Sequence, residues 1–166
     1  MPISPPLPVT LDAYQKSDQS SFLAWCADET AFRFLRKSLP GAPPPGELFE
    51  HLRQLSLEST QGNRVWAIRS SERELTGHLE CKRTEKTAEE EGEVVVFVAP
   101  AFRRRHVATQ AIRLLADRSI ALPEFNRLLG VCRPDHQASP AILEAAGFSV
   151  SESESAPDGL WYRRDI

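Results

Sequence analysis

Residues 98–109 read Val-Ala-Pro-Ala-Phe-Arg-Arg-Arg-His-Val-Ala-Thr. The stretch predicts an apolar strand that runs into a proline, a basic turn and the start of a helix. The first N–H groups of a helix lack intrahelical partners and carry positive partial charge, so such a turn suits an anion, for example a pyrophosphate. The arginines at 103–105 add donors that match phosphate oxygens. The alternative is a solvated basic turn without a ligand.

The rest of the chain predicts short, alternating elements. Strands are expected where apolar or alternating runs end at turn residues, over residues 7–11, 64–69, 74–83, 93–98, 127–132, 148–153 and 159–164. Helices are expected where apolar side chains recur at helical spacing, over residues 20–35, 47–57 and 107–119. A further short helix should have Ser139 as N-cap, Pro140 as its first residue and Gly147 just past its end. The order β-α-α-β-β-β-α-β-α-β-β is not that of a doubly wound fold.

Composition limits the classes of function. The chain has 166 residues and a net charge of −3, which predicts a single domain over residues 1–166 and no general attraction to nucleic acid. The proline-rich start has no leader-like pattern and no apolar run is long enough to span a bilayer, so a cytoplasmic protein without a membrane partner is expected. Cys26, Cys81 and Cys132 are too scattered for a disulfide framework, and the histidines lack ligand spacing, so no metal is expected.

The stretch at 98–109 resembles the acyl-CoA-binding motif of the GNAT acetyltransferase superfamily, V-x-P-x-x-[QR]-x-x-G-x-[GA]. Val98, Pro100, Arg103 and Ala108 match that motif. His106 stands where the family has glycine, and a side chain there narrows the approach of the backbone to the phosphates. The resemblance implies acetyl-CoA as co-substrate, with these cofactor-binding residues: Val96, Phe97, Val98, Arg103, Arg104, Arg105, His106, Val107, Ala108, Thr109 and His136.

Residues 136–148, His-Gln-Ala-Ser-Pro-Ala-Ile-Leu-Glu-Ala-Ala-Gly-Phe, are similar to the N-x-A-S-x-x-x-L-E-K-x-G-F segment of the RimJ/RimL-like branch. His136 replaces the asparagine that contacts the pantetheine arm in relatives. Residues 25–35 and 77–79 also resemble that branch. The likeness therefore covers nearly the whole chain. It implies the α/β GNAT fold, a mixed and mostly antiparallel central sheet with helices on both faces.

The resemblance implies direct attack of a primary amine on the acetyl thioester. The backbone of residues 96–98 would hold the pantetheine, and an N–H at Phe97 or Val98 would stabilise the oxyanion. Glu80 and Glu93 are the candidate bases, the alternative being that both are surface carboxylates at strand ends. The position of the base in some N-terminal acetyltransferases is occupied here by Val131.

Protonation of the leaving thiolate also needs a residue. The tyrosine that serves other branches falls at Leu143, which has no proton to give. A serine of RimL-like relatives falls at Ser139, which is therefore the candidate acid, and His136 could substitute because histidine titrates near neutrality. The alternative is that Ser139 only caps a helix.

The acceptor is expected to be a protein N-terminus or a small-molecule amine. The two N-terminal helices, the proline-rich loop at 38–46 and the loop before the last strand should bind it. Acidic runs at 85–93 and 152–158 would favour a cationic amine, or simply keep the surface soluble. The chain is expected to be a monomer or a homodimer. The alternative function is a non-catalytic acyl-CoA-binding protein, in which His106 and Leu143 mark lost chemistry.

Overall fold

The computed structural model describes residues 4–38, 41, 43–58, 62–118, 120–132, 140–150 and 159–166. The helices are α1 (Gln19–Cys26), α2 (Glu29–Leu35), α3 (Pro45–Leu57), α4 (Val107–Ala116) and α5 (Pro140–Ala145). The strands are β1 (Val9–Asp12), β2 (Asn63–Ser70), β3 (Leu75–Lys82), β4 (Glu91–Val98), β5 (Arg127–Cys132), β6 (Ser149–Val150) and β7 (Leu160–Asp165). Short 3-10 turns are η1 (Lys16–Asp18), η2 (Arg36–Ser38) and η3 (Pro100–Phe102).

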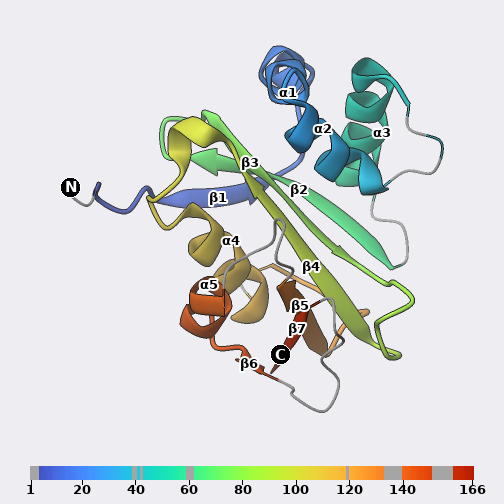
Figure 1. The fold of residues 1–166 in the computed structure, drawn as a ribbon, viewed down its shortest axis with the longest axis vertical. Helices are drawn as coiled ribbons and strands as arrows, with labels where there is room; N and C mark the ends of the chain where they lie inside the picture. The colour runs from blue at the N-terminus through green and yellow to red at the C-terminus, as the bar shows by residue number, and fades with distance from the viewer. Residues whose placement is uncertain are drawn as a thin grey trace.

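The strands form one sheet of seven in the order β1-β2-β3-β4-β5-β7-β6 (Figure 1). Within the described strands, only β4 and β5 pair in parallel, and they do so over residues 91–93 and 127–129. Beyond that point β4 continues to Val98 along β3 alone. The edge of β4 over residues 94–98 is therefore not paired with the described residues of β5. This mixed, mostly antiparallel sheet confirms the predicted fold class.

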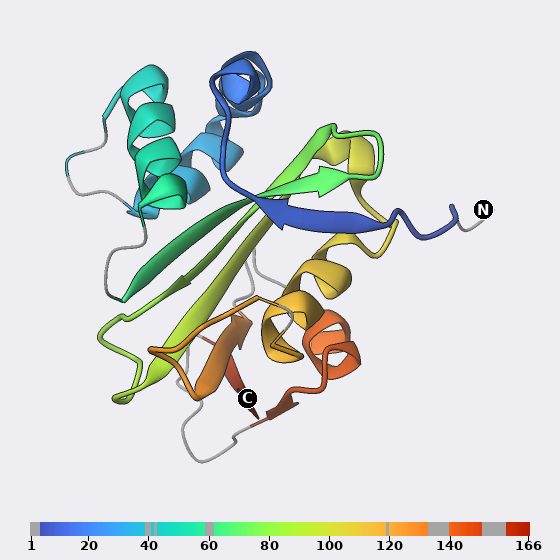
Figure 2. The ribbon, with the colours of Figure 1, turned by 180° about the vertical axis from the view of Figure 1, so that it is seen from behind.

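Two apolar cores cover opposite faces of the sheet, because successive strand residues point to opposite sides. Helices α4 and α5 pack on one face, where Ile112 and Leu143 meet Leu79 and Val94. Helices α1 and α3 pack on the other, where the core includes Phe97. Figures 1 and 2 show α1–α3 grouped together and apart from α4 and α5. Helices therefore lie on both faces, as predicted.

The helix predicted over residues 20–35 is wrong as a single element. The chain leaves helical geometry at Asp28, which has extended backbone angles (φ −82°, ψ 120°). The Asp28 side chain accepts a hydrogen bond of 2.9 Å from the N–H of Ala31 and so caps the start of α2. The order consequently gains one helix between β1 and β2.

Other boundaries shift by a few residues. Strand β4 begins at Glu91, two residues earlier than expected, and α3 begins at Pro45. Helix α4 ends at Ala116, before the predicted end at Ser119, a residue outside the described part of the chain. Strand β6 covers only residues 149–150, and residues 151–153 of the predicted strand lie outside the described part as well. Gly147 follows α5 with φ +86°, which confirms its predicted role at the end of that helix.

A buried ion pair holds the start of α1 on the sheet. The guanidinium of Arg69, on β2, donates to both carboxylate oxygens of Asp18, at 2.8 and 2.6 Å. The Arg69 side chain is 2% exposed and that of Asp18 is 7% exposed. Arg69 also donates to the carbonyl of Ala13 at 3.0 Å. This pair anchors the segment that leads from β1 into α1.

Two findings concern the described part of the chain alone. None of its helices is long and apolar enough to cross a membrane. None of its His, Cys, Asp and Glu side chains gather into a group of three or more that could hold a metal ion.

Candidate active site

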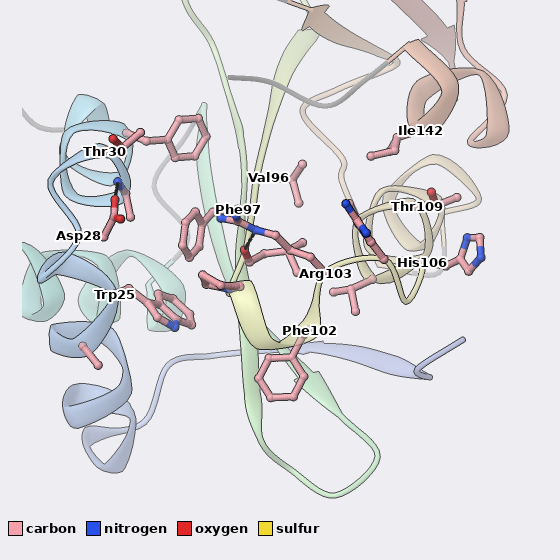
Figure 3. Close-up of a pocket in the computed structure, with 18 residues that line it drawn as sticks. Trp25, Asp28, Thr30, Val96, Phe97, Phe102, Arg103, His106, Thr109 and Ile142 are labelled. Carbon is pink, nitrogen blue, oxygen red and sulfur yellow. Dashed lines mark hydrogen bonds between the residues drawn. The ribbon is translucent and has the colours of Figure 1, made fainter. Parts of the chain in front are cut away.

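A cavity of about 990 Å³ opens at the end of β4 (Figure 3). Its wall comes from α1 and α2, the end of β4, η3 with the turn that follows it, the first turn of α4, and one residue of α5. The residues that line it are Ala24, Trp25, Asp28, Thr30, Ala31, Phe34, Val96, Phe97, Val98, Pro100, Phe102, Arg103, Arg104, His106, Val107, Ala108, Thr109 and Ile142. Most of this lining is apolar.

The cavity brings together most of the predicted cofactor residues. Residues 96–98, 103, 104 and 106–109 all line it. Arg105 is the exception, because its side chain turns away and donates from Nε to the carbonyl of Pro5 at 3.4 Å. His136 and the candidate acid Ser139 lie outside the described residues.

The edge of β4 that is not paired with β5, residues 94–98, presents backbone groups to the cavity. The N–H of Ala99 donates to the carbonyl of Thr76, so the backbone N–H of Ala99 points toward β3. The N–H and C=O groups of successive strand residues point to alternate sides of the strand. Those of Phe97 therefore point toward β3 as well, while those of Val96 and Val98 point to the open side. The Val98 carbonyl there accepts a hydrogen bond of 3.1 Å from Nε of Arg103. Of Phe97 and Val98, Val98 is therefore the residue whose N–H lies on the side away from β3.

The basic turn has an unusual backbone. Arg104 (φ 62°) and His106 (φ 58°) both adopt the left-handed region that favours glycine. His106 occupies the N-cap of α4 without a capping bond from its side chain. The N–H groups of residues 107–109 then begin α4 and have no acceptor within the helix. The glycine geometry of the motif is thus retained although the residue is histidine.

An N-terminal arm, residues 5–7, is attached to the back of this turn. The N–H of Leu7 donates to the Arg105 carbonyl at 3.0 Å, and Nε2 of Gln110 donates to the Leu7 carbonyl at 2.8 Å. Because a trans peptide is planar, fixing the Arg105 carbonyl toward the arm turns the His106 N–H to the opposite side. The arm therefore helps to orient the turn.

Aromatic rings and one carboxylate form the opposite wall. The ring of Phe97 lies 5.1 Å from that of Trp25 and 6.3 Å from that of Phe34, between centroids. Asp28 stands in the break between α1 and α2, beside Thr30 (Figure 3). The sequence prediction had this N-terminal segment at the acceptor site but missed Asp28, because it joined α1 and α2 into one helix although Asp28 followed by Glu29 is typical of a helix start.

Neither candidate base lines the cavity. Glu80 is buried on β3, with Oε1 at 2.7 Å from His78 Nε2 and Oε2 at 3.2 Å from Lys82 Nζ. The other ring nitrogen of His78 lies 2.7 Å from the hydroxyl of Tyr14, whose pKa is raised well above its usual value by burial. Together these side chains form a continuous polar chain between the sheet and the N-terminal helices.

Glu93 shares a face of β4 with Phe97 and lies opposite Lys82 of β3. It accepts a hydrogen bond of 2.9 Å from the hydroxyl of Thr84, and Lys86 Nζ lies 3.8 Å from its Oε1. Four residues of extended chain separate it from Phe97, about 13 Å. Action of Glu93 at the cavity would therefore pass through water.

Residues predicted to contribute to the acceptor site are only partly brought together. Helices α1 and α2 line the cavity, whereas the described residues of α3 and of the loops at 38–46 and 85–93 do not. The acidic run at 152–158 lies outside the described residues. Leu143 is buried against the backbone of Gly130, so its position belongs to the core.

The chain matches the acetyltransferase (GNAT) domain family over residues 9–149. Among curated proteins, none matches. Solved structures that resemble it include the RimL ribosomal L7/L12 alpha-N-protein acetyltransferase in complex with coenzyme A, at 18% identity and a TM-score of 0.69, covering 99% of this chain and 97% of that one.

Two further structures agree with this fold. An acetyltransferase from Thermus thermophilus has 18% identity and a TM-score of 0.63, with complete coverage (100%) of both chains. A spermidine N-acetyltransferase from Vibrio cholerae, in complex with CoA and spermine, has 13% identity and a TM-score of 0.66, covering 95% of this chain and 94% of that one. At such identities the structures show a shared fold, and it is the family match over most of the sequence that decides membership. The chain is an acyltransferase that belongs to the GNAT acetyltransferase family.

Proposed function

We propose that this protein transfers an acetyl group from acetyl-CoA to a primary amine, on a protein N-terminus or a small molecule, by direct attack of the amine on the thioester. The observation that carries the proposal is a single cavity with a basic turn at one end, an aromatic wall with a carboxylate at the other, and the free edge of β4 between them. The RimL and spermidine acetyltransferase structures contain CoA, and the second contains spermine as well, which supports both substrate classes.

The residues of the turn fit the pyrophosphate of CoA. Arg103 and Arg104 supply two permanent cations at the cavity wall. The N–H groups of residues 106–109 supply donors at the start of α4. CoA would contribute the activated thioester, and the edge of β4 at Val96 and Val98 would hold its pantetheine arm and donate to the oxyanion.

Proton transfer is assigned to side chains that the family resemblance indicates. Glu93 is our proposed base, with Glu80 as the second candidate. Because Glu93 lies about 13 Å along β4 from Phe97, it would act on the amine through a chain of several water molecules. Ser139 is the proposed donor to the leaving thiolate, with His136 as its substitute.

The test is release of free thiol from acetyl-CoA in the presence of a panel of primary amines. Catalysis predicts thiol release that depends on the amine and yields its acetamide. Tight CoA binding without thiol release for any amine would instead favour the non-catalytic acyl-CoA-binding alternative.

Binding of CoA should weaken as salt rises. Arg103 and Arg104 are exposed, so their attraction to phosphate is screened when the Debye length falls from about 10 Å at about 0.1 M to about 3 Å at about 1 M. Calorimetry over this range should show a severalfold increase in Kd. An Arg104→Gln variant should show a smaller salt dependence. Absence of CoA binding at low salt would contradict the assignment of the turn.

Replacing His106 by glycine should leave the Kd for CoA unchanged or lower it. Glycine adopts the left-handed backbone at position 106 without steric cost and opens space for the phosphates. Arg104→Gly is the matched control, because it relieves the same kind of backbone strain but removes a cation, and it should raise the Kd. A large loss of affinity in His106→Gly would show that the imidazole makes an essential contact.

A further inference from the structure

The break between α1 and α2 places a carboxylate in the same cavity lining as the aromatic rings of Trp25, Phe34 and Phe97. Asp28 follows Trp25 by three residues around the end of α1, and Phe34 comes from α2. Trp25 and Phe34 both pack near Phe97, with ring centroids 5.1 and 6.3 Å away. Rings and a carboxylate side by side attract an ammonium group, since the ring faces and the carboxylate are both negative.

Asp28 retains an oxygen for a ligand. Its Oδ1 accepts the capping hydrogen bond from Ala31, and among the described residues none donates to Oδ2. Around the cavity, Asp28 is also the one described residue with a carboxylate. Exposure of its side chain means that solvent and ligands reach it.

The rest of the lining limits what the ammonium can carry. Figure 3 shows Arg103 over the end of β4, where its Nε donates to the Val98 carbonyl. Because Arg103 and Arg104 are assigned to the pyrophosphate of CoA, a second ammonium group on the acceptor would find no further carboxylate in the described lining. Besides Asp28 and the basic residues of the turn, the described lining offers hydrogen-bonding side-chain groups only at Trp25, Thr30 and Thr109. Hydroxyl-rich amines and peptide backbones would lose water there without gaining partners, which costs free energy.

On the proposed function, we infer that the acceptor is a small amine with one positive charge on an apolar, aromatic skeleton, an arylalkylamine, and that Asp28 selects it. The ammonium meets Oδ2 of Asp28 while the skeleton packs on Trp25, Phe34 and Phe97. The ammonium then loses one proton to solvent or to the proposed base, and its nitrogen bonds to the thioester carbonyl carbon. The carbon–sulfur bond breaks as the CoA thiolate leaves, and the second proton of the nitrogen passes to the thiolate through the proposed donor. Asp28 is thus a specificity-determining residue.

The test compares phenethylamine, spermidine and a short peptide with a free N-terminal phenylalanine as acceptors. We expect kcat/KM for phenethylamine to exceed the other two values at least about tenfold, because the latter two would leave polar and charged groups unpaired in the cavity. Higher efficiency with spermidine or the peptide would overturn the inference. Thiol release with none of the amines would overturn the proposed function as well.

Asp28→Asn isolates the charge, because asparagine caps a helix about as well as aspartate. The KM for phenethylamine should rise about 10- to 100-fold, the range expected for a hydrogen bond to a charged group, while the Kd for CoA and the Tm stay unchanged. Glu29→Gln is the control: it removes the neighbouring charge, whose side chain is 85% exposed and pairs with Arg33 instead, and should leave KM unchanged. An equal KM in Asp28→Asn and the parent protein would overturn the inference while leaving the acetyltransferase activity intact.

Discussion

Replacing Asp18 by alanine should lower the free energy of unfolding by about 3–5 kcal/mol. The substitution leaves the Arg69 guanidinium, 2% exposed, without its carboxylate partner, and an uncompensated buried charge is far more costly than the pair itself. The N–H of Gln15 also loses its acceptor, which is Oδ2 of Asp18 at 2.7 Å. Urea unfolding followed by tryptophan fluorescence measures the change.

Asp12→Ala is the matched control. Asp12 lies 3.8 Å from Nε of the same Arg69, but its side chain is 37% exposed. Exposed pairs of this kind contribute about 0–1 kcal/mol, so the control should unfold nearly as the parent does. Similar losses in both variants would show that the two carboxylates share the Arg69 charge rather than one of them neutralising it.

Replacing the proposed base by glutamine should lower turnover about 100- to 10,000-fold and leave the Kd for CoA nearly unchanged. We expect this result for Glu93→Gln. Glu80→Gln should act first on stability, because both Glu80 oxygens are engaged inside the protein by His78 and Lys82. Turnover and thermal unfolding measured on the same preparations distinguish a base from a structural carboxylate.

Ser139→Ala completes the comparison. Loss of a proton donor should lower turnover, whereas loss of a helix cap should cost about 1 kcal/mol of stability and spare the rate per folded molecule. Near-normal turnover in all three variants would mean that the amine loses its proton in solution and that the enzyme acts by positioning.

The sequence predicted the part of the site whose signals are local. The basic turn, the start of α4 and the glycine that ends α5 each depend on a few neighbouring residues, and the structure has them where expected. The family resemblance, rather than periodicity, supplied the mixed sheet. Assignments to Ser139 and His136 stay predictions, as does the oligomeric state.

The features that the sequence did not predict depend on contacts between distant segments. Residues 20–35 have helical spacing throughout, so the break at Asp28 was not expected from periodicity; Asp28 is stabilised as a cap while Trp25 and Phe34 reach the same ring of Phe97 from two different helices. Glu80 and His78 lie two residues apart on one face of β3, and it is the distant Tyr14 that bonds to His78 and completes their burial away from the cavity.

Hydrogen bonds from Leu7 to Arg105 and from Gln110 to Leu7 link the docking of the arm, residues 5–7, to the conformation of the 103–106 turn. Any ligand that favours the observed conformation of the 103–106 turn must favour the docked arm by the same free energy, because coupling between two sites is reciprocal. The affinity of the turn for its ligand therefore changes when residues are fused to the arm or removed from it. Conversely, occupation of the turn should stabilise the docked arm, so residues 5–7 respond to the state of a cavity that they do not line.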